Sequence, residues 1–257
     1  MRRASLILSL LGLFVLGAPL AASAQSPFPL QYSERPLTIN EGTIAVRAAL
    51  DYFKIADQGP LTFDPLISLI ADVSYGITDD FEVNVLALPL VLSPDTDYGN
   101  PVLSATYRFY RGPVEVGGYL GIRIPVQDGS DLQLTPGLPV LLGLTGTTKI
   151  ITGVYLPITF GDDTVVSLSI PIEFSANLGP QFFIFLNSGI ALPDMDPDFA
   201  NVPLGVGLGY SLAAAADRPL ADLYAAFQFP LFINAAAADT IVTDVFEFQI
   251  GARFFLN

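Results

Sequence analysis

Apolar and polar residues alternate along most of this chain. Within residues 114–126, apolar side chains occupy most even-numbered positions, whereas Glu115, Tyr119 and Arg123 occupy odd-numbered positions. Successive side chains of a β-strand point to opposite faces, so this segment has one apolar and one polar face. A sheet with this alternation, closed on itself, has an apolar outer surface and a polar interior.

Twelve segments carry this pattern, each long enough to cross a bilayer as a tilted strand of about 9–11 residues. Short turns follow most even-numbered segments, and longer loops rich in Asp, Pro and Gly follow most of the others. This arrangement is typical of an all-β, transmembrane, antiparallel up-and-down β-barrel. We predict such a barrel over residues 41–257, with about twelve strands and with ten or fourteen as alternatives. The segments are 43–53, 66–77, 81–90, 102–110, 114–126, 132–144, 149–160, 164–178, 181–192, 202–212, 221–232 and 245–256.

Proline occurs inside several of these segments. Proline lacks the N–H group that a strand donates to its neighbour, so in a sheet it marks an edge or a bulge. We predict bulges at these positions: Pro89, Pro125, Pro139, Pro157, Pro171, Pro203 and Pro230.

The first 24 residues have the pattern of an export signal. Arg2 and Arg3 precede an apolar run over residues 6–20, and Ala22-Ser23-Ala24 offers a cleavage site. The chain contains no Cys, so neither a lipid anchor on Cys nor a disulfide is available. Residues 25–40 show no periodicity. They form a plug in the lumen, a periplasmic segment that contacts a partner, or a disordered terminus, and the sequence leaves all three open.

Composition favours the outer membrane as the location. The mean hydropathy is +0.54 and 51% of residues are hydrophobic, yet no later segment has the roughly 20 consecutive apolar residues of a spanning helix. An exported chain of this kind hides its apolar surface in strands, with outer-membrane lipid as its surroundings and both termini in the periplasm. The net charge of −14 argues against a nucleic-acid partner.

Aromatic residues mark one rim of the predicted barrel. Amphipathic rings favour the boundary between lipid and water. Seven rings have outward parity near predicted periplasmic strand ends and form a predicted membrane girdle: Tyr75, Phe81, Phe109, Phe174, Phe182, Tyr210 and Phe254.

Parity places eleven charged residues on the lumen side: Arg47, Asp51, Asp72, Glu82, Arg108, Glu115, Arg123, Glu173, Asp222, Glu247 and Arg253. We expect Glu82, Arg108 and Glu115 to meet near the periplasmic mouth. Closure of the barrel brings Arg47, Arg253 and Asp72 together. These residues form either a layer of salt bridges that braces the wall or a selectivity ring for permeating solutes. The excess of acids over arginines predicts a preference for cations.

Two segments resemble known barrels. Residues 246–254 resemble the terminal strand that marks outer-membrane barrels for their assembly machinery, because Phe246, Phe248, Ile250 and Phe254 share outward parity. The resemblance implies the barrel-assembly machinery as a partner. Residues 75–84, followed by Leu88-Pro-Leu, resemble transporter-like barrels associated with aromatic-compound degradation operons. We use this second resemblance for architecture alone.

The chain lacks His, the usual base of barrel hydrolases, and we assign no catalytic residue, metal site or cofactor. The function that the sequence favours is a narrow porin-like channel for small solutes. The alternative is a closed barrel that anchors an envelope-spanning complex for secretion, surface assembly or motility, with periplasmic or outer-membrane partner proteins.

Overall fold

The computed structural model describes residues 28–56, 62–214, 218–236 and 242–256. The predicted signal, residues 1–24, lies outside the described residues. The described strands are β1 (Ile44–Ile55), β2 (Leu66–Thr78), β3 (Phe81–Ser93), β4 (Asp97–Tyr98), β5 (Val102–Tyr110), β6 (Val114–Arg123), β7 (Leu132–Thr145), β8 (Thr148–Tyr155), β9 (Ile158–Phe160), β10 (Thr164–Val166), β11 (Leu168–Asn177), β12 (Phe182–Leu192), β13 (Asn201–Ala213), β14 (Pro219–Asn234) and β15 (Val245–Leu256). Three short 3₁₀ turns complete the described secondary structure: η1 (Tyr32–Glu34), η2 (Pro193–Met195) and η3 (Pro197–Phe199).

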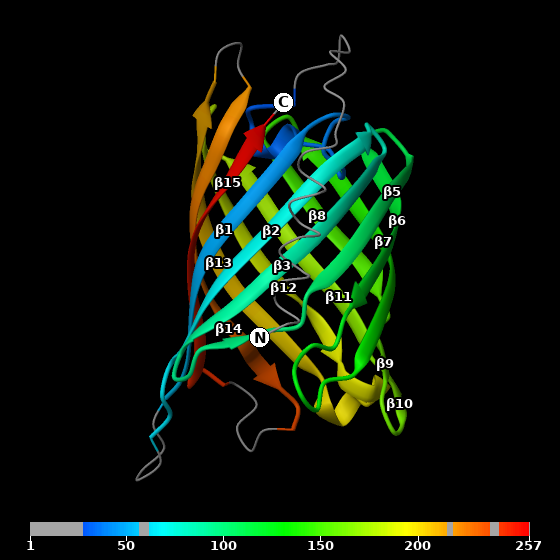
Figure 1. Ribbon diagram of the computed structural model, residues 1–257. Helices are drawn as coiled ribbons and strands as arrows, with labels where there is room; N and C mark the ends of the chain where they lie inside the picture. The colour runs from blue at the N-terminus through cyan, green and yellow to red at the C-terminus, as the bar shows by residue number, and fades with distance from the viewer. Residues whose placement is uncertain (1–27, 57–61, 215–217, 237–241, 257) are drawn as a thin grey trace.

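These strands form a closed antiparallel barrel with twelve strands in its wall (Figure 1). Most strands pair with the next strand along the chain, but β3 pairs with β5, β7 with both β8 and β9, and β8 with β11. Strand β1 closes the wall by pairing with β15. The closing register runs without a shift from Ile44 opposite Leu256 to Ile55 opposite Val245. The predicted fold class and strand number are therefore confirmed. No helix among the described residues is long and apolar enough to span a bilayer.

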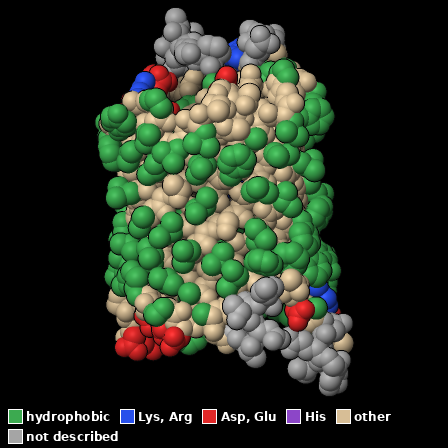
Figure 2. Space-filling model, turned by 180° about the vertical axis from the view of Figure 1, so that it is seen from behind, with side chains coloured by type: hydrophobic (Ala, Val, Ile, Leu, Met, Phe, Trp, Pro, Cys, Tyr) green, Lys and Arg blue, Asp and Glu red, His purple; other side chains and the backbone are tan. Residues whose placement is uncertain are grey.

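The two faces of the wall differ as the alternation requires. Outward side chains such as Leu208 and Ile250 are 61% and 46% exposed, whereas inward Ser175 and Ser211 are fully buried. Figure 2 shows hydrophobic side chains over the wall and charged ones near its two ends. The outer surface is apolar because every second residue of each strand faces outward.

The prolines interrupt the wall at some predicted sites and not at others. The β13–β14 register shifts between Val202 and Leu204, next to Pro203 and opposite the stretch that holds Pro230. Strand β8 ends before Pro157, and strand β6 ends before Pro125. By contrast, Pro171 pairs in register with Gly189 and Pro139 with Gly153, so the prediction of bulges there was wrong. Proline is tolerated at strand positions where the backbone N–H would not donate a hydrogen bond to a neighbouring strand.

The two ends of the barrel differ in their connections. One end holds tight turns, such as the turn between β2 and β3, together with the C-terminal end of β15 (Figure 1, top). The other end holds β4, β9, β10, η2 and η3. We call these the short-turn end and the long-loop end.

Candidate functional site

The N-terminal segment, residues 28–43, lies inside the barrel at the short-turn end (Figure 1). Its side chains and backbone contact strands from both halves of the wall, including β3, β6, β11 and β14. Phe28 and Ile39 form a buried apolar cluster with Ala45 of β1 and Phe255 of β15. The segment therefore forms a plug across this end of the lumen.

Arg35 anchors the plug. Its guanidinium is buried and forms a bidentate ion pair with Asp222 of β14, through Nη1 and through Nη2 at 2.9 Å. Nη2 also donates to Ser211 Oγ at 3.1 Å, and Ser211 Oγ donates to Asp222 Oδ1 at 2.8 Å. The ring centroids of Phe28 and Phe255 lie 5.5 and 5.1 Å from the guanidinium carbon. Removing one partner of such a buried pair costs about 3–5 kcal/mol, because the other charge is left uncompensated.

Side chains of the wall also hold the plug backbone. A buried N–H group without an acceptor costs free energy, so these bonds fix the path of the segment. Three N–H groups donate to three strands: Ser33 N to Asn177 Oδ1, Leu37 N to Glu115 Oε2 and Ile39 N to Glu82 Oε2, each at 2.8 Å.

Tyr32 extends from the plug to two strands of the wall, β11 and β12. Its ring stacks on Phe183 with centroids 4.4 Å apart, and its hydroxyl donates to Glu173 Oε1 at 3.1 Å. Lys149 Nζ lies 4.3 Å from the ring centroid. Burial, followed by the nearby Glu173 carboxylate, raises the pKa of the Tyr32 hydroxyl above its ordinary value. Tyr32 is therefore a neutral hydrogen-bond donor at physiological pH.

Arginines tie the tight turns to the plug site. Arg108 Nε donates to Asp80 Oδ1 at 3.0 Å, and Arg108 Nη1 donates to Glu115 Oε2 at 2.9 Å. Arg111 also binds Asp80. The hydrogen bond from Arg111, reinforced by that from Arg108, lowers the pKa of the Asp80 carboxyl. One charge network thus joins the turns to Glu115, which accepts a hydrogen bond from Leu37 N of the plug.

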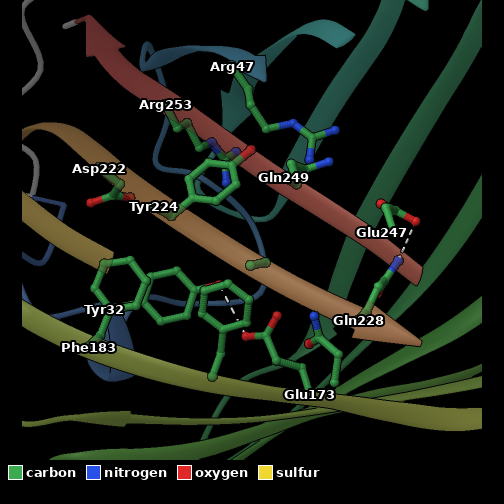
Figure 3. Close-up of a pocket in the computed structure, with 13 residues that line it drawn as sticks. Tyr32, Arg47, Glu173, Phe183, Asp222, Tyr224, Gln228, Glu247, Gln249 and Arg253 are labelled. Carbon is green, nitrogen blue, oxygen red and sulfur yellow. Dashed lines mark hydrogen bonds between the residues drawn. The ribbon is translucent and has the colours of Figure 1, made fainter. Parts of the chain in front are cut away.

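A chamber of about 310 Å³ lies next to the plug, with Tyr32 and Phe183 in its lining (Figure 3). The other lining residues are Arg47, Glu173, Phe185, Asn187, Asp222, Tyr224, Ala226, Gln228, Glu247, Gln249 and Arg253. Glycines of β13 make room for the rings, since a Cβ on Gly209 would lie 2.1 Å from Phe183 Cζ. The chamber is polar, charged and walled in part by aromatic rings.

The charged side chains of the chamber occupy two register rows of the sheet. One row, nearer the short-turn end, contains Ser211, Asp222, Arg253, Arg47 and Asp72 on consecutive strands. The second row contains Glu173, Asn187, Gly205, Gln228 and Glu247. Arginines occur in the first row alone, and carboxylates without an arginine partner occur in the second.

The predicted lumen residues divide into three groups in the structure. Arg47, Glu173, Asp222, Glu247 and Arg253 line the chamber, and Arg47 binds Asp72. Glu82, Arg108 and Glu115 lie at the plug and the turns. Asp51 Oδ1 and Arg123 Nε are buried without a hydrogen-bond partner. Whether these eleven residues govern permeation stays a prediction.

The structure gives the contacts within the two predicted groups, and Arg253, Arg47 and Asp72 lie on one register row as predicted. Arg108 binds Glu115, but Glu82 accepts its hydrogen bond from Ile39 N. Arg47 binds Asp72, whereas Arg253 does not. The plug binds Glu82 through Ile39 N and Asp222 through Arg35. Sequence reasoning did not identify Arg35 and Tyr32 as site residues. The signal that could have identified Arg35 is that it is the only cation in residues 25–40.

The predicted girdle rings lie on outward strand positions near the short-turn end. Phe182, Phe109 and Phe254 are 56%, 55% and 45% exposed. Phe182 and Tyr210 are in edge contact, with centroids 4.7 Å apart. The other girdle residues, Tyr75, Phe81 and Phe174, are half-buried. Their position at a membrane boundary stays a prediction.

No protein-family model matches the sequence, and no curated protein matches it either. Solved outer-membrane porins match the fold. The NanC porin has a TM-score of 0.61 at 9% identity, over 81% of this chain and 98% of that chain. The KdgM porin in complex with disordered oligogalacturonate has a TM-score of 0.60 at 7% identity, over 83% and 99%. An outer membrane channel from Pseudomonas putida F1 has a TM-score of 0.59 at 12% identity, over 85% and 97%.

None of these comparisons tests the resemblance to barrels of aromatic-compound degradation operons. At these identities the likeness concerns the fold: the chain has the barrel fold of solved outer-membrane porins.

Proposed function

We propose that this protein is an integral outer-membrane β-barrel that acts as a narrow porin-like channel for small solutes, with both termini in the periplasm. The observation that carries the proposal is the chamber of about 310 Å³, which is lined by charged and amide side chains inside a closed wall. A purely structural barrel would gain stability by filling this space with side chains.

The size of the barrel supports the same conclusion. Eight-stranded barrels are filled by their own side chains, whereas barrels of 16 or more strands leave an aqueous channel. A wall of twelve strands lies between these cases. Here the plug narrows one end and leaves the chamber of about 310 Å³ beside it.

The plug gives the channel a specific expected behaviour. Because Arg35 and Asp222 anchor the plug, removing both should loosen it without leaving a buried charge unpaired. We therefore expect small, discrete openings from the native protein in planar bilayers and larger ones from the Arg35→Gln/Asp222→Asn variant. The excess of inward acids predicts a preference for cations over anions.

The experiment compares single-channel conductance of the mature protein, the double variant and an Arg111→Gln control. Arg111 is an exposed turn residue that binds Asp80, and its removal leaves the Arg35–Asp222 ion pair intact. The control should conduct as the native protein does. If neither the native protein nor the double variant conducts, the channel function is wrong.

One observation favours a second candidate function. The plug already fills the short-turn end through several buried contacts, as a closed anchor for an envelope-spanning complex would require. Absence of conductance in both forms, together with stable co-purification of a defined periplasmic protein that contacts the short turns, would support this anchor.

A further inference from the structure

The chamber separates its charges by sign along the barrel. On β15 the inward residues run from Glu247 through Gln249 to Arg253, and on β1 they run from Asp51 to Arg47. Figure 3 shows Arg47 and Arg253 at one end, Gln249 between, and Glu247 with Gln228 at the other end. Six strand positions on β15 separate Arg253 from Glu247, which corresponds to roughly 20 Å. The chamber therefore has one positive and one negative end.

The positive end contains a guanidinium without a carboxylate partner. The cross-strand neighbours of Arg253 are Asp222 and Arg47. Asp222 is bound by Arg35 of the plug, and Arg47 is bound to Asp72. Among the described residues Arg253 forms no ion pair, and its guanidinium lies 5.5 Å from the Phe255 ring centroid. Like charges on directly opposed strand positions repel, so an anionic group beside Arg253 and Arg47 would stabilise this end.

Among the described residues no lysine or arginine lines the negative end of the chamber. Glu247 Oε2 accepts a hydrogen bond from Gln228 Nε2 at 2.7 Å. Asp51 is its diagonal neighbour on the inner face, and Asp51 Oδ1 is buried without a hydrogen-bond partner. Within the described part of the chain neither carboxylate forms an ion pair. An ammonium group carries three donors and the positive charge that this end lacks.

The space between the two ends is lined by amides and rings. Gln249, Gln228 and Asn187 each have both a donor and an acceptor, which is the hydrogen-bonding capacity of a peptide group. An extended tripeptide spans about 10 Å, which leaves roughly 10 Å of strand length for the long side chains of Arg253 and Glu247 to span. The volume of about 310 Å³ is at the lower end of the range for small-molecule sites.

We propose that the chamber binds a short linear peptide with free termini, with its carboxylate at Arg253 and Arg47 and its ammonium group at Glu247. The inference deepens the proposed function by naming the solute class, and it rests on that function for the route by which the peptide enters. The plug contributes to the site in two ways: Tyr32 forms part of the lining, and Arg35 keeps Asp222 away from Arg253.

Three matched probes test the charge pattern by calorimetric titration of the mature, detergent-folded protein. Tri-alanine carries both charges, N-acetyl-tri-alanine only the carboxylate, and tri-alanine amide only the ammonium group. We expect tri-alanine to bind, and each single-charge probe to bind about tenfold more weakly or worse, because a charge-assisted contact is lost. This comparison of probes requires no variant to fold.

Variants then assign each end of the peptide. Arg253→Gln should weaken tri-alanine binding and abolish the preference for tri-alanine over its amide. Glu247→Gln should abolish the preference for tri-alanine over its N-acetyl form. Arg123→Gln removes an inward arginine outside the chamber and should leave all three affinities unchanged.

Two results would overturn the inference: N-acetyl-tri-alanine binding as tightly as tri-alanine, or no binding of any probe. Its failure is distinguishable from failure of the channel function. A barrel that conducts but binds no peptide retains the channel and excludes this solute class. A barrel that binds tri-alanine with the expected charge pattern but stays silent in bilayers supports the site without the channel.

Discussion

At the scale of single residues, Gly76 decides how closely the plug approaches the wall. A Cβ at this position would lie 2.1 Å from the carbonyl oxygen of Asn40 and 2.9 Å from that of Ile39, both of which belong to the backbone. Gly42 N also donates to Gly76 O at 2.8 Å. Glycine is therefore required here because two backbones cross in contact.

We expect Gly76→Ala to destabilise the protein by about 1–3 kcal/mol, the usual cost of overpacking a well-packed position. The plug should also become more sensitive to chymotrypsin at Tyr32. Urea unfolding and limited proteolysis measure the two effects. Gly118→Ala is the matched control, since a Cβ there meets nothing within 4 Å. Equal effects of the two variants would contradict the assigned role of Gly76.

Asp80 makes stability depend on pH. Hydrogen bonds from Arg111 and then Arg108 lower the pKa of its carboxyl in the folded protein. A lowered pKa means that the stabilisation is present above the pKa of the unfolded chain and is lost as the pH falls through the folded value. The free energy of unfolding should therefore decrease on acidification below about pH 4. Urea titrations across this range should show a shallower decrease for Asp80→Asn, and an unchanged slope would assign the effect to other carboxylates.

At the scale of elements, β15 offers neighbouring residues that face lipid and lumen. Ile250 faces outward at 46% exposure near the middle of the strand, whereas Gln249 faces the chamber. An arginine facing lipid at mid-depth costs about 2–4 kcal/mol. We expect Ile250→Arg to lower the stability of the barrel folded in lipid vesicles by up to this amount and Gln249→Arg to lower it less. Similar losses for both variants would show that the assigned faces are wrong.

The wall strands and the plug differ in how far the sequence predicts them. A strand leaves a period of two in its own residues, so each wall segment, including β15 with Phe246 and Phe248, was recognisable locally. Residues 28–40 have no period, because their partners belong to distant strands, and Arg35 and Asp222 are 187 residues apart. The sequence therefore left a plug, a periplasmic segment and a disordered terminus open.

The candidate site depends on the same distinction. Parity placed Arg47, Asp222 and Arg253 on the inner face, but it could not say which of them would keep a free charge. That outcome depends on Arg35, which binds Asp222 in place of the cross-strand neighbour Arg253. The face that a residue occupies can be predicted from its own strand, whereas its ion-pair partner depends on all the side chains in the lumen.

At the scale of the whole molecule, the plug compensates for the width of the barrel. Inward serines such as Ser175 and Ser211 are too small to fill the lumen from the wall. The plug fills one end with Phe28, Arg35 and Tyr32 and leaves the chamber beside it. The filled end and the chamber are thus two separate parts of one lumen, and both require the sheet to be closed.

Closure itself can be tested by linking the first and last strands. Ala48 of β1 lies directly opposite Ala252 of β15, on the outer face, and the natural chain contains no Cys. Opposed residues of an antiparallel pair have Cα atoms about 4.5–5.5 Å apart, within the range that a disulfide spans. We expect Ala48→Cys/Ala252→Cys to oxidise to an intramolecular disulfide, detected as faster migration of the denatured chain in non-reducing gels. Ala48→Cys/Ile250→Cys is the control, because diagonal positions lie about 7–8 Å apart and should link poorly. Preferential linking of the control pair would indicate a register shifted by two residues, and absence of any link would show that β1 and β15 do not close the wall.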